Sequence, residues 1–260
     1  MEKERQVIDL ISDNFHLHAS KIPDLSNEMS LHSLPHIMYV DSGLSCDTFN
    51  IIYIHHPDLT KEELNQALDH FQSRNLDYCM WINKENLTSN IQILFNQLKI
   101  EKQASEVGMA MQFEHYQYIE NVNHLSIRQV NDRESLKVYS RVIAENWSPT
   151  DQNVITYYSR TANHYLDPNN NIKLYIYYYE DQPVSCVELF PTNSETVGFY
   201  GFATLEAYRG KGIGTTLLTF ALNRAKELGY KNAILQGTED GLNIYKKFGF
   251  KDYTTYYEFV

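Results

Sequence analysis

This chain lacks the features that mark membrane and secreted proteins. It has no apolar run close to the about 20 residues that a membrane helix needs. Four of the first six residues are charged, and the apolar segment of a secretory signal is missing. The three cysteines, Cys46, Cys79 and Cys186, lie far apart and form no C-x-x-C pair. We therefore expect free buried thiols, no membrane partner and a cytoplasmic location.

Positive charge is also scarce. The 260 residues include 22 Lys and Arg against 33 Asp and Glu, for a net charge of −11. Residues 1–124 carry 18 acidic and 8 basic side chains, whereas residues 125–260 carry 15 and 14. Nucleic-acid binding requires clustered Lys and Arg to neutralise phosphates, so this balance argues against a nucleic-acid partner. The length fits one large domain or two modest ones.

Metal-ligand patterns are missing as well. The ten histidines include two short pairs, His16 with His18 and His55 with His56. Neither pair has a carboxylate at ligand spacing, so no metal site is predicted.

Glycine is rare until the last quarter of the chain. Only Gly43 and Gly108 precede residue 197, and the other nine glycines fall within residues 198–249. Glycine occurs where the backbone takes positive φ or approaches another group closely. We therefore expect the chemistry to concentrate in that region.

Hydrophobic periodicity predicts two successive sets of strands and helices, with a polar linker at 114–123. In the first half, strands are expected at 37–40, 49–54, 78–82 and 107–113, and helices at 60–73 and 88–98. In the second half, strands are expected at 125–130, 173–179, 184–190, 197–204, 232–236 and 252–259, and helices at 132–145, 151–165, 212–228 and 239–248. The predicted domains are therefore 1–124 and 125–260.

The segment Tyr208–Leu218 places three glycines within five residues, between a strand and an amphipathic helix. Backbone N–H groups at such a junction can converge on an anion, and Arg209 and Lys211 add charge suited to a pyrophosphate. Ile213 follows Gly212 where a nucleotide P-loop has Ser or Thr, which excludes that motif. By itself the loop is equally compatible with an ordinary glycine-rich turn.

Two patterns together are more specific than this loop alone. The R-x-x-G-x-G pattern of Arg209, Gly212 and Gly214 resembles the acetyl-coenzyme A pyrophosphate motif of the GCN5-related N-acetyltransferases. About 30 residues later, Ile244–Phe250 resembles the second cofactor motif of that family, a helix ending in L-Y-x-x-x-G-F. The resemblance extends over residues 125–260 and, more faintly, over the first half.

The resemblance implies an α/β fold (α+β in the stricter sense), with a mixed, mostly antiparallel sheet flanked by helices in two tandem units. The first half has no R-x-x-G-x-G pattern, so it is expected to be a degenerate copy without its own cofactor loop. The implied activity is transfer of an acetyl group from acetyl-coenzyme A, as co-substrate, to a primary amine of a small molecule or protein. The amine attacks the thioester directly, and no acyl-enzyme forms.

Residue roles follow from motif position. Tyr245 is expected to protonate the leaving sulfur, and the backbone N–H groups of Phe202, Ala203 and Thr204 to meet the developing oxyanion. The pyrophosphate contacts are expected from Arg209, Gly210, Lys211, Gly212, Ile213, Gly214 and Thr215. Thr238 stands where many relatives have Asn. The general base is open among Glu188, Glu195, Glu239 and Asp240, with Glu188 and Glu195 on or beside central strands.

A non-catalytic acyl-coenzyme A sensor or interaction module is the alternative function. It would keep the phosphate loop and lose the groups that transfer protons. The sequence does not choose between a monomer and a homodimer, nor does it identify the acceptor amine.

Overall fold

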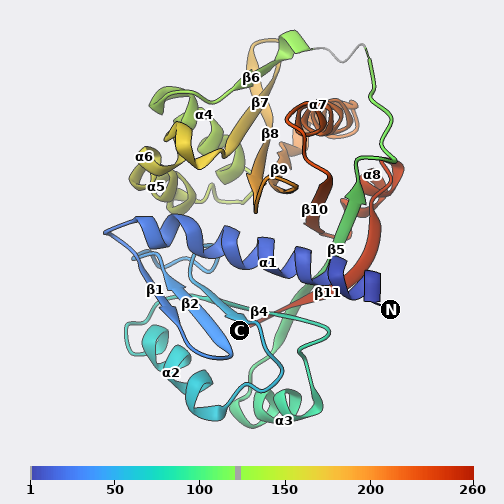
Figure 1. Ribbon diagram of the computed structural model, residues 1–260. Coiled ribbons are helices and arrows are strands. Elements are labelled where there is room, and N and C mark those ends of the chain that lie inside the picture. Colours follow the sequence, from blue (N-terminus) through green and yellow to red (C-terminus); the bar gives the residue numbers. More distant parts are fainter. Residues whose placement is uncertain (1, 121–123) are drawn as a thin grey trace. The chain divides into compact units, whose positions relative to one another are not determined.

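The computed structural model describes residues 2–120 and 124–260 (Figure 1), and these form two compact units. The first unit comprises Met1–Met109, Gln236–Leu242 and Asp252–Val260, and the second comprises Ala110–Leu235 and Asn243–Lys251. The last strand of the chain therefore belongs to the unit with which the chain begins. The predicted domain boundary after residue 124 stays a prediction.

The first unit is built around five paired strands. Its elements are α1 (Glu2–Leu25), β1 (Ser30–Ser33), β2 (Ile37–Asp41), β3 (Ile51–Ile54), α2 (Lys61–Gln72), β4 (Cys79–Asn83), α3 (Ser89–Leu98), β5 (Lys102–Gln112) and β11 (Lys251–Phe259). The strand order is β1-β2-β3-β4-β11, in which only the β3–β4 pair is parallel. The predicted capping box of Thr60 and Glu63 opens α2.

Side chains that alternate along β3 supply two separate cores. Ile52 and Ile54 pack with Leu64 and Phe71 of α2, in the cluster that also includes α3 residues. Tyr53 points to the opposite face, where its ring centroid lies 4.9 Å from that of Phe15 on α1. Because successive side chains of a strand point to opposite faces, α1 and the α2–α3 pair cover different faces of this sheet.

The second unit holds most of the predicted cofactor motifs. Its elements are β6 (Ile127–Gln129), α4 (Arg133–Ala144), α5 (Gln152–Arg160), α6 (Ala162–Tyr165), β7 (Lys173–Tyr179), β8 (Gln182–Pro191), β9 (Thr196–Thr204), α7 (Ile213–Glu227), β10 (Asn232–Gly237) and α8 (Leu242–Lys247), with 3₁₀ turns at His124–Ser126, Pro168–Asn170 and Glu206–Tyr208. The strand order β10-β9-β8-β7-β6 is antiparallel except for β10–β9. This arrangement confirms the predicted mixed, mostly antiparallel sheet with flanking helices.

Helices lie on both faces of the second sheet. The ring of Phe220 on α7 lies 5.0 Å from that of Tyr175 on β7, and Tyr175 pairs with Val187 of β8. Glu188, the next residue of β8, therefore faces the other side, which α4 and α5 cover. Figure 1 shows α4, α5 and α6 on one side of these strands and α7 on the other.

Two predicted helices differ from those observed, and two elements were not predicted. The helix expected at 151–165 is interrupted at Thr161, whose buried hydroxyl donates to the carbonyl of Tyr157, so that α5 and α6 are separate. The last helix begins only at Leu242, because Thr238–Gly241 form a turn. The 24-residue α1 and the short strand β1 were not predicted.

The segment expected as a polar linker is tied down where it is described. Lys226 of α7 donates to the carbonyls of Phe113 and Tyr116, at 3.2 and 2.5 Å. The Tyr116 hydroxyl donates to Asn223 Oδ1 at 2.9 Å. The end of the predicted linker, residues 121–123, lies outside the described residues.

Other expectations concern cysteines, metals and membranes. All three cysteines are free and buried, as predicted. Across residues 2–120 and 124–260, no group of three His, Cys, Asp or Glu side chains could hold a metal ion. No helix in these ranges has both the length and the apolar character needed to span a membrane.

Candidate active site

The glycine-rich loop connects β9 to α7 and has the backbone geometry that anion binding requires. Gly210 and Gly212 take φ angles of 75° and 78°, in the left-handed region where a side chain is strained. A Cβ built at either position meets no atom of the chain within 4 Å. The space beside both glycines is therefore open.

The first turn of α7 offers donors to this open space. Gly212 is the N-cap residue, and no side-chain hydrogen bond caps the helix. The first N–H groups of an α-helix have no partner within the helix, and the helix dipole places partial positive charge at this end. Backbone donors from Ile213, Gly214 and Thr215 can therefore meet an anion.

Arg209 is held beside the loop by two contacts. Its Nε donates to the Thr204 carbonyl at 2.9 Å, and Nη2 donates to Asn146 Oδ1 at 3.1 Å. A guanidinium has five donors, so these bonds fix its plane and leave donors for a ligand. Asn146, just after α4, was not predicted, since no sequence pattern links positions 63 residues apart.

Lys211 supplies the second positive charge of the loop. Its Nζ lies 4.8 Å from the ring centroid of Tyr208 and 5.4 Å from that of Tyr179. These cation–π contacts, each about 0.5–1 kcal/mol at an exposed site, keep the ammonium close to the loop.

A β-bulge shapes the end of β9 before the loop. Cys186 pairs with Ala203 and Glu188 with Tyr200, so two residues of β9, Gly201 and Phe202, oppose Val187 alone. Gly201 takes φ 52°, and a Cβ there would lie 2.7 Å from the Tyr139 hydroxyl oxygen. A bulge bends its strand and redirects the following residues, here the predicted oxyanion donors Phe202, Ala203 and Thr204.

The end of β9 that includes Phe202–Thr204 lies beyond its parallel pairing with β10. In the described residues, β9 and β10 pair over Thr196–Gly198 and Asn232–Ile234 only. Phe199–Thr204 continue beyond this register along β8. The Ser185 hydroxyl donates to the Ala203 carbonyl at 2.6 Å, which fixes the strand on its β8 side.

Tyr245 lies on α8 and is 8% exposed. Its ring centroid lies 6.0 Å from that of Phe202 and 6.0 Å from that of Phe250. Phe202 also contacts the loop side, because a Cβ at Gly214 would lie 3.5 Å from its ring. Phe202, a predicted oxyanion donor, thus lies beside both Tyr245, the predicted leaving-group donor, and the phosphate loop at Gly214.

Glu188 is almost fully buried, at 1% exposure, beneath α4 and α5. The pKa of Tyr157 is raised above its usual range, mainly by burial and secondly by the charge of Glu188. The same two causes, in the same order, raise the pKa values of Tyr158 and Tyr165. Burial is also the main cause that raises the pKa of Tyr139, and the charge of Glu188 contributes to this shift. Glu188 therefore lies within a group of four buried tyrosines that remain protonated at neutral pH.

The other three predicted carboxylates are exposed. Glu195 is in the turn before β9, at the opposite end of that strand from Thr204, and forms an ion pair with Lys231. Glu239 and Asp240 are exposed residues of the turn before α8. Thr238 is exposed in the same turn, where its carbonyl accepts from the Gly241 N–H.

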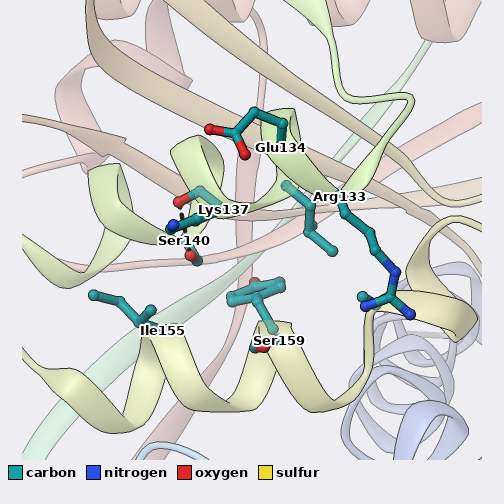
Figure 2. Close-up of a pocket in the computed structure, with 9 residues that line it drawn as sticks. Arg133, Glu134, Lys137, Ser140, Ile155 and Ser159 are labelled. Carbon is teal, nitrogen blue, oxygen red and sulfur yellow. Dashed lines mark hydrogen bonds between the residues drawn. The ribbon is translucent and has the colours of Figure 1, made fainter.

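A separate pocket of about 250 Å³ lies between α4 and α5 (Figure 2). Leu136, Ile155 and Tyr158 contribute its apolar part, and Arg133 and Lys137 outnumber Glu134 among its charged residues. Figure 2 shows Lys137 and Ser140 on one helix facing Ile155 and Ser159 on the other. A net positive lining does not favour a cationic ligand in this pocket.

Part of this chain matches a known protein-family model. Residues 137–250 match the model of the "Acetyltransferase (GNAT) family". This match includes the loop, the bulge of β9 and Tyr245. A search of the curated proteins gives no match.

Solved structures share the fold over most of the chain. A GCN5-related N-acetyltransferase from Kribbella flavida is 14% identical, with a TM-score of 0.66, covering 95% of this chain and 94% of its own. One from Sphaerobacter thermophilus is 14% identical, with a TM-score of 0.58, covering 86% and 79%. A tandem GNAT protein from the clavulanic acid biosynthesis pathway is 10% identical, with a TM-score of 0.58, covering 90% and 83%. At these identities the likeness concerns the fold.

Proposed function

We propose that this chain, whose residues 137–250 match the GNAT acetyltransferase family model, transfers an acetyl group from acetyl-coenzyme A to a primary amine. The observation that carries the proposal is the open loop Arg209–Gly214 at the start of α7. It combines backbone donors, two positive side chains and two glycines with positive φ.

The residues present fit the pyrophosphate of acetyl-coenzyme A. Gly210 and Gly212 have positive φ and open space beside them, and α7 begins without a side-chain cap. Arg209 is oriented by Thr204 and Asn146, so its remaining donors are available at low entropic cost. When bound, acetyl-coenzyme A supplies a thioester carbon that an amine can attack.

The reaction requires three protein contributions. As the new C–N bond forms and the C–S bond breaks, negative charge develops first on the carbonyl oxygen and then on sulfur. Backbone N–H groups at Phe202–Thr204, set beyond the bulge at Gly201, are proposed as donors to that oxygen. The Tyr245 hydroxyl is proposed to give a proton to sulfur, while the amine nitrogen loses one to a base.

For Glu188 the burial points to an indirect role. At 1% exposure its carboxylate is not positioned to contact a solvent-borne amine directly. We assign it to positioning, since its charge lies among the hydroxyls of Tyr139, Tyr157, Tyr158 and Tyr165. Glu195 is not included, because it lies at the far end of β9.

One observation favours the alternative of an acyl-coenzyme A sensor. Tyr245 packs against Phe202 and Phe250 and is only 8% exposed, which is also the setting of a tyrosine that serves packing alone. A sensor would bind acetyl-coenzyme A at the same loop without turning it over.

The two functions differ in thiol release. We would follow free coenzyme A thiol with the full chain, acetyl-coenzyme A and a panel of primary amines that includes diamines, amino sugars and lysine peptides. Release that depends on one amine class, with acetylated product by mass spectrometry, supports the transferase. Saturable binding of acetyl-coenzyme A with no release above the solvent rate for any amine would support the sensor.

A further inference from the structure

A second pocket, within the first unit, has a composition unlike the phosphate loop. It has a volume of about 220 Å³ and is formed by the first half of α1, the end of β3 and the segment after β4. Sites for drug-sized ligands measure about 300–1,000 Å³, so this pocket suits a smaller molecule. Its lining residues are Arg5, Ile8, Asp9, Ser12, Asp13, His16, Tyr53, His55, Asn83, Glu85 and Asn86.

Two of the buried polar residues in the pocket are already satisfied. The Tyr53 hydroxyl hydrogen-bonds with Ser12 and Tyr256. Asn83 Nδ2 donates to the Ser12 hydroxyl at 3.2 Å, and Asn83 Oδ1 accepts from the Asn86 backbone N–H at 3.0 Å. These bonds hold one wall of the pocket rigidly in place.

Asn86 is the exception. It is 8% exposed and lines the pocket, and its side-chain amide bonds to no residue in the described parts of the chain. A ligand that enters the pocket can therefore form hydrogen bonds with this amide. The pocket thus contains both a donor and an acceptor that the protein itself does not use.

The formal charge of the lining is negative. Asp9, Asp13 and Glu85 face a single arginine, Arg5, which pairs with Asp9 at 3.2 Å. The Asp13 carboxylate has no hydrogen bond or ion pair with another described residue, and Glu85 accepts one bond, from Thr254. The remaining charge therefore favours a cation.

The two histidines do not reverse this sign. Burial lowers the pKa values of His16 and His55 below the usual range, so both rings are neutral at pH 7. Their centroids are 5.5 Å apart, and the ring of His16 lies 6.0 Å from that of Tyr53. These faces add aromatic surface, which also attracts a cation.

A metal ion does not fit the pocket. Within residues 2–120 and 124–260, no three His, Cys, Asp or Glu side chains are close enough to hold one. An ammonium group needs fewer ligands, because it binds through three N–H donors to oxygens spaced more widely.

We propose that this pocket binds a small organic cation of the primary-ammonium class, with its charge at Asp13 and Glu85 and a hydrogen bond to the Asn86 amide. All the lining residues belong to the first unit. The site is therefore separate from the phosphate loop and does not depend on the proposed transfer reaction. It gives the first unit a ligand of its own.

The test is calorimetric titration of the full chain with 1,4-diaminobutane at pH 7 without acetyl-coenzyme A. Saturable binding is expected, and the uncharged analogue 1,4-butanediol should not bind. Asn86→Ala should weaken binding at least tenfold, because a hydrogen bond to a charged group is lost. Asp13→Asn should weaken it at least threefold.

The matched control is Asp58→Asn, at a carboxylate with 79% exposure outside the pocket, which should bind within twofold of the parent. Both pocket variants should keep the parent melting temperature, since neither side chain makes a hydrogen bond to the rest of the chain. Binding that survives both pocket variants unchanged would place the diamine elsewhere and overturn the proposal. Absence of binding to the parent chain would overturn it too.

Discussion

The rings of Tyr245 and Phe250 lie 6.0 Å apart because Gly249 reverses the chain between them. Gly249 takes φ 96°, its N–H donates to the Lys246 carbonyl, and the Phe250 N–H donates to the Tyr245 carbonyl. This is the Schellman geometry, in which the residue after the glycine packs on the last helical turn. The spacing between Tyr245 and the Gly249–Phe250 pair is therefore that of a Schellman helix end. The same helix end positions the Tyr245 ring against Phe250.

The Tyr245 hydroxyl should matter for rate and not for folding. Tyr245→Phe keeps the ring contacts with Phe202 and Phe250 and removes only the proton donor. General acid–base groups contribute about 10²–10⁴-fold, so we expect kcat to fall at least tenfold with a nearly unchanged Kd for acetyl-coenzyme A. Steady-state kinetics and calorimetry would measure both. Tyr178→Phe, on β7, is the control, and full activity of Tyr245→Phe would mean that the residue only packs.

Gly212 should be required for binding of acetyl-coenzyme A. A ligand at 100 times its Kd stabilises the folded state by about 2.7 kcal/mol. Gly212→Val places a branched side chain in the open cradle, so this stabilisation should be lost. Gly229→Val is the matched control, because Gly229 also has positive φ and open space but lies after α7. Both variants carry the backbone strain, and only the first should lose the ligand-induced thermal shift. An equal shift in both would place the cradle elsewhere.

Residues 1–113 should bind no acetyl-coenzyme A of their own. They contain no glycine-rich loop between a strand and a helix, since Gly43 and Gly108 are their only glycines. Calorimetric titration should give one site per chain, and Gly212→Val should abolish it. A second site that persists in this variant would contradict the interpretation of the first half as a degenerate copy.

Asn223 should hold the segment before residue 121 against α7. Its amide accepts from the Ile119 N–H at 3.3 Å and from the Tyr116 hydroxyl at 2.9 Å, and it donates to the Ile119 carbonyl at 2.8 Å. Asn223 is 1% exposed, so Asn223→Ala leaves these groups unpaired and should cost about 1–3 kcal/mol of unfolding free energy. Urea denaturation would show it. Asn163→Ala, at an exposed site, should cost less than about 0.5 kcal/mol.

Glu106 should make stability fall at alkaline pH. Burial, and next the charge of Glu258, raise its pKa to about 8 in the folded state. Its stabilising effect is therefore complete below the unfolded pKa of about 4.3 and is lost progressively from there up to pH 8, at about 1.4 kcal/mol per pH unit. Glu106→Gln should lose about 2.7 kcal/mol less than the parent between pH 6 and pH 9 in urea denaturation. Glu62→Gln, an exposed control, should follow the parent, and equal slopes for all three would show that Glu106 does not ionise in this range.

Local patterns were enough to predict much of the second unit. The apolar spacing of Leu217, Leu218, Ala221 and Leu222 indicates the buried face of α7, and all four are buried. Gly229 directly follows the helix predicted at 212–228, and its N–H donates to the Lys226 carbonyl. These features depend on residues within a few positions of one another, so periodicity and turn chemistry suffice.

The tertiary structure alone decided the features that join distant segments. No local pattern indicates that Asn146 orients Arg209, that the Tyr139 hydroxyl requires glycine at position 201, or that β11 pairs with β4. Such contacts depend on which strands pair and in what register, and one sequence permits several registers before packing selects one. The sequence by itself determined the helix that follows the phosphate loop, whereas packing determined where the candidate carboxylates lie. Packing buried Glu188 among tyrosines. It left Glu195 at the end of β9 opposite Thr204, because the direction of β9 depends on the whole fold.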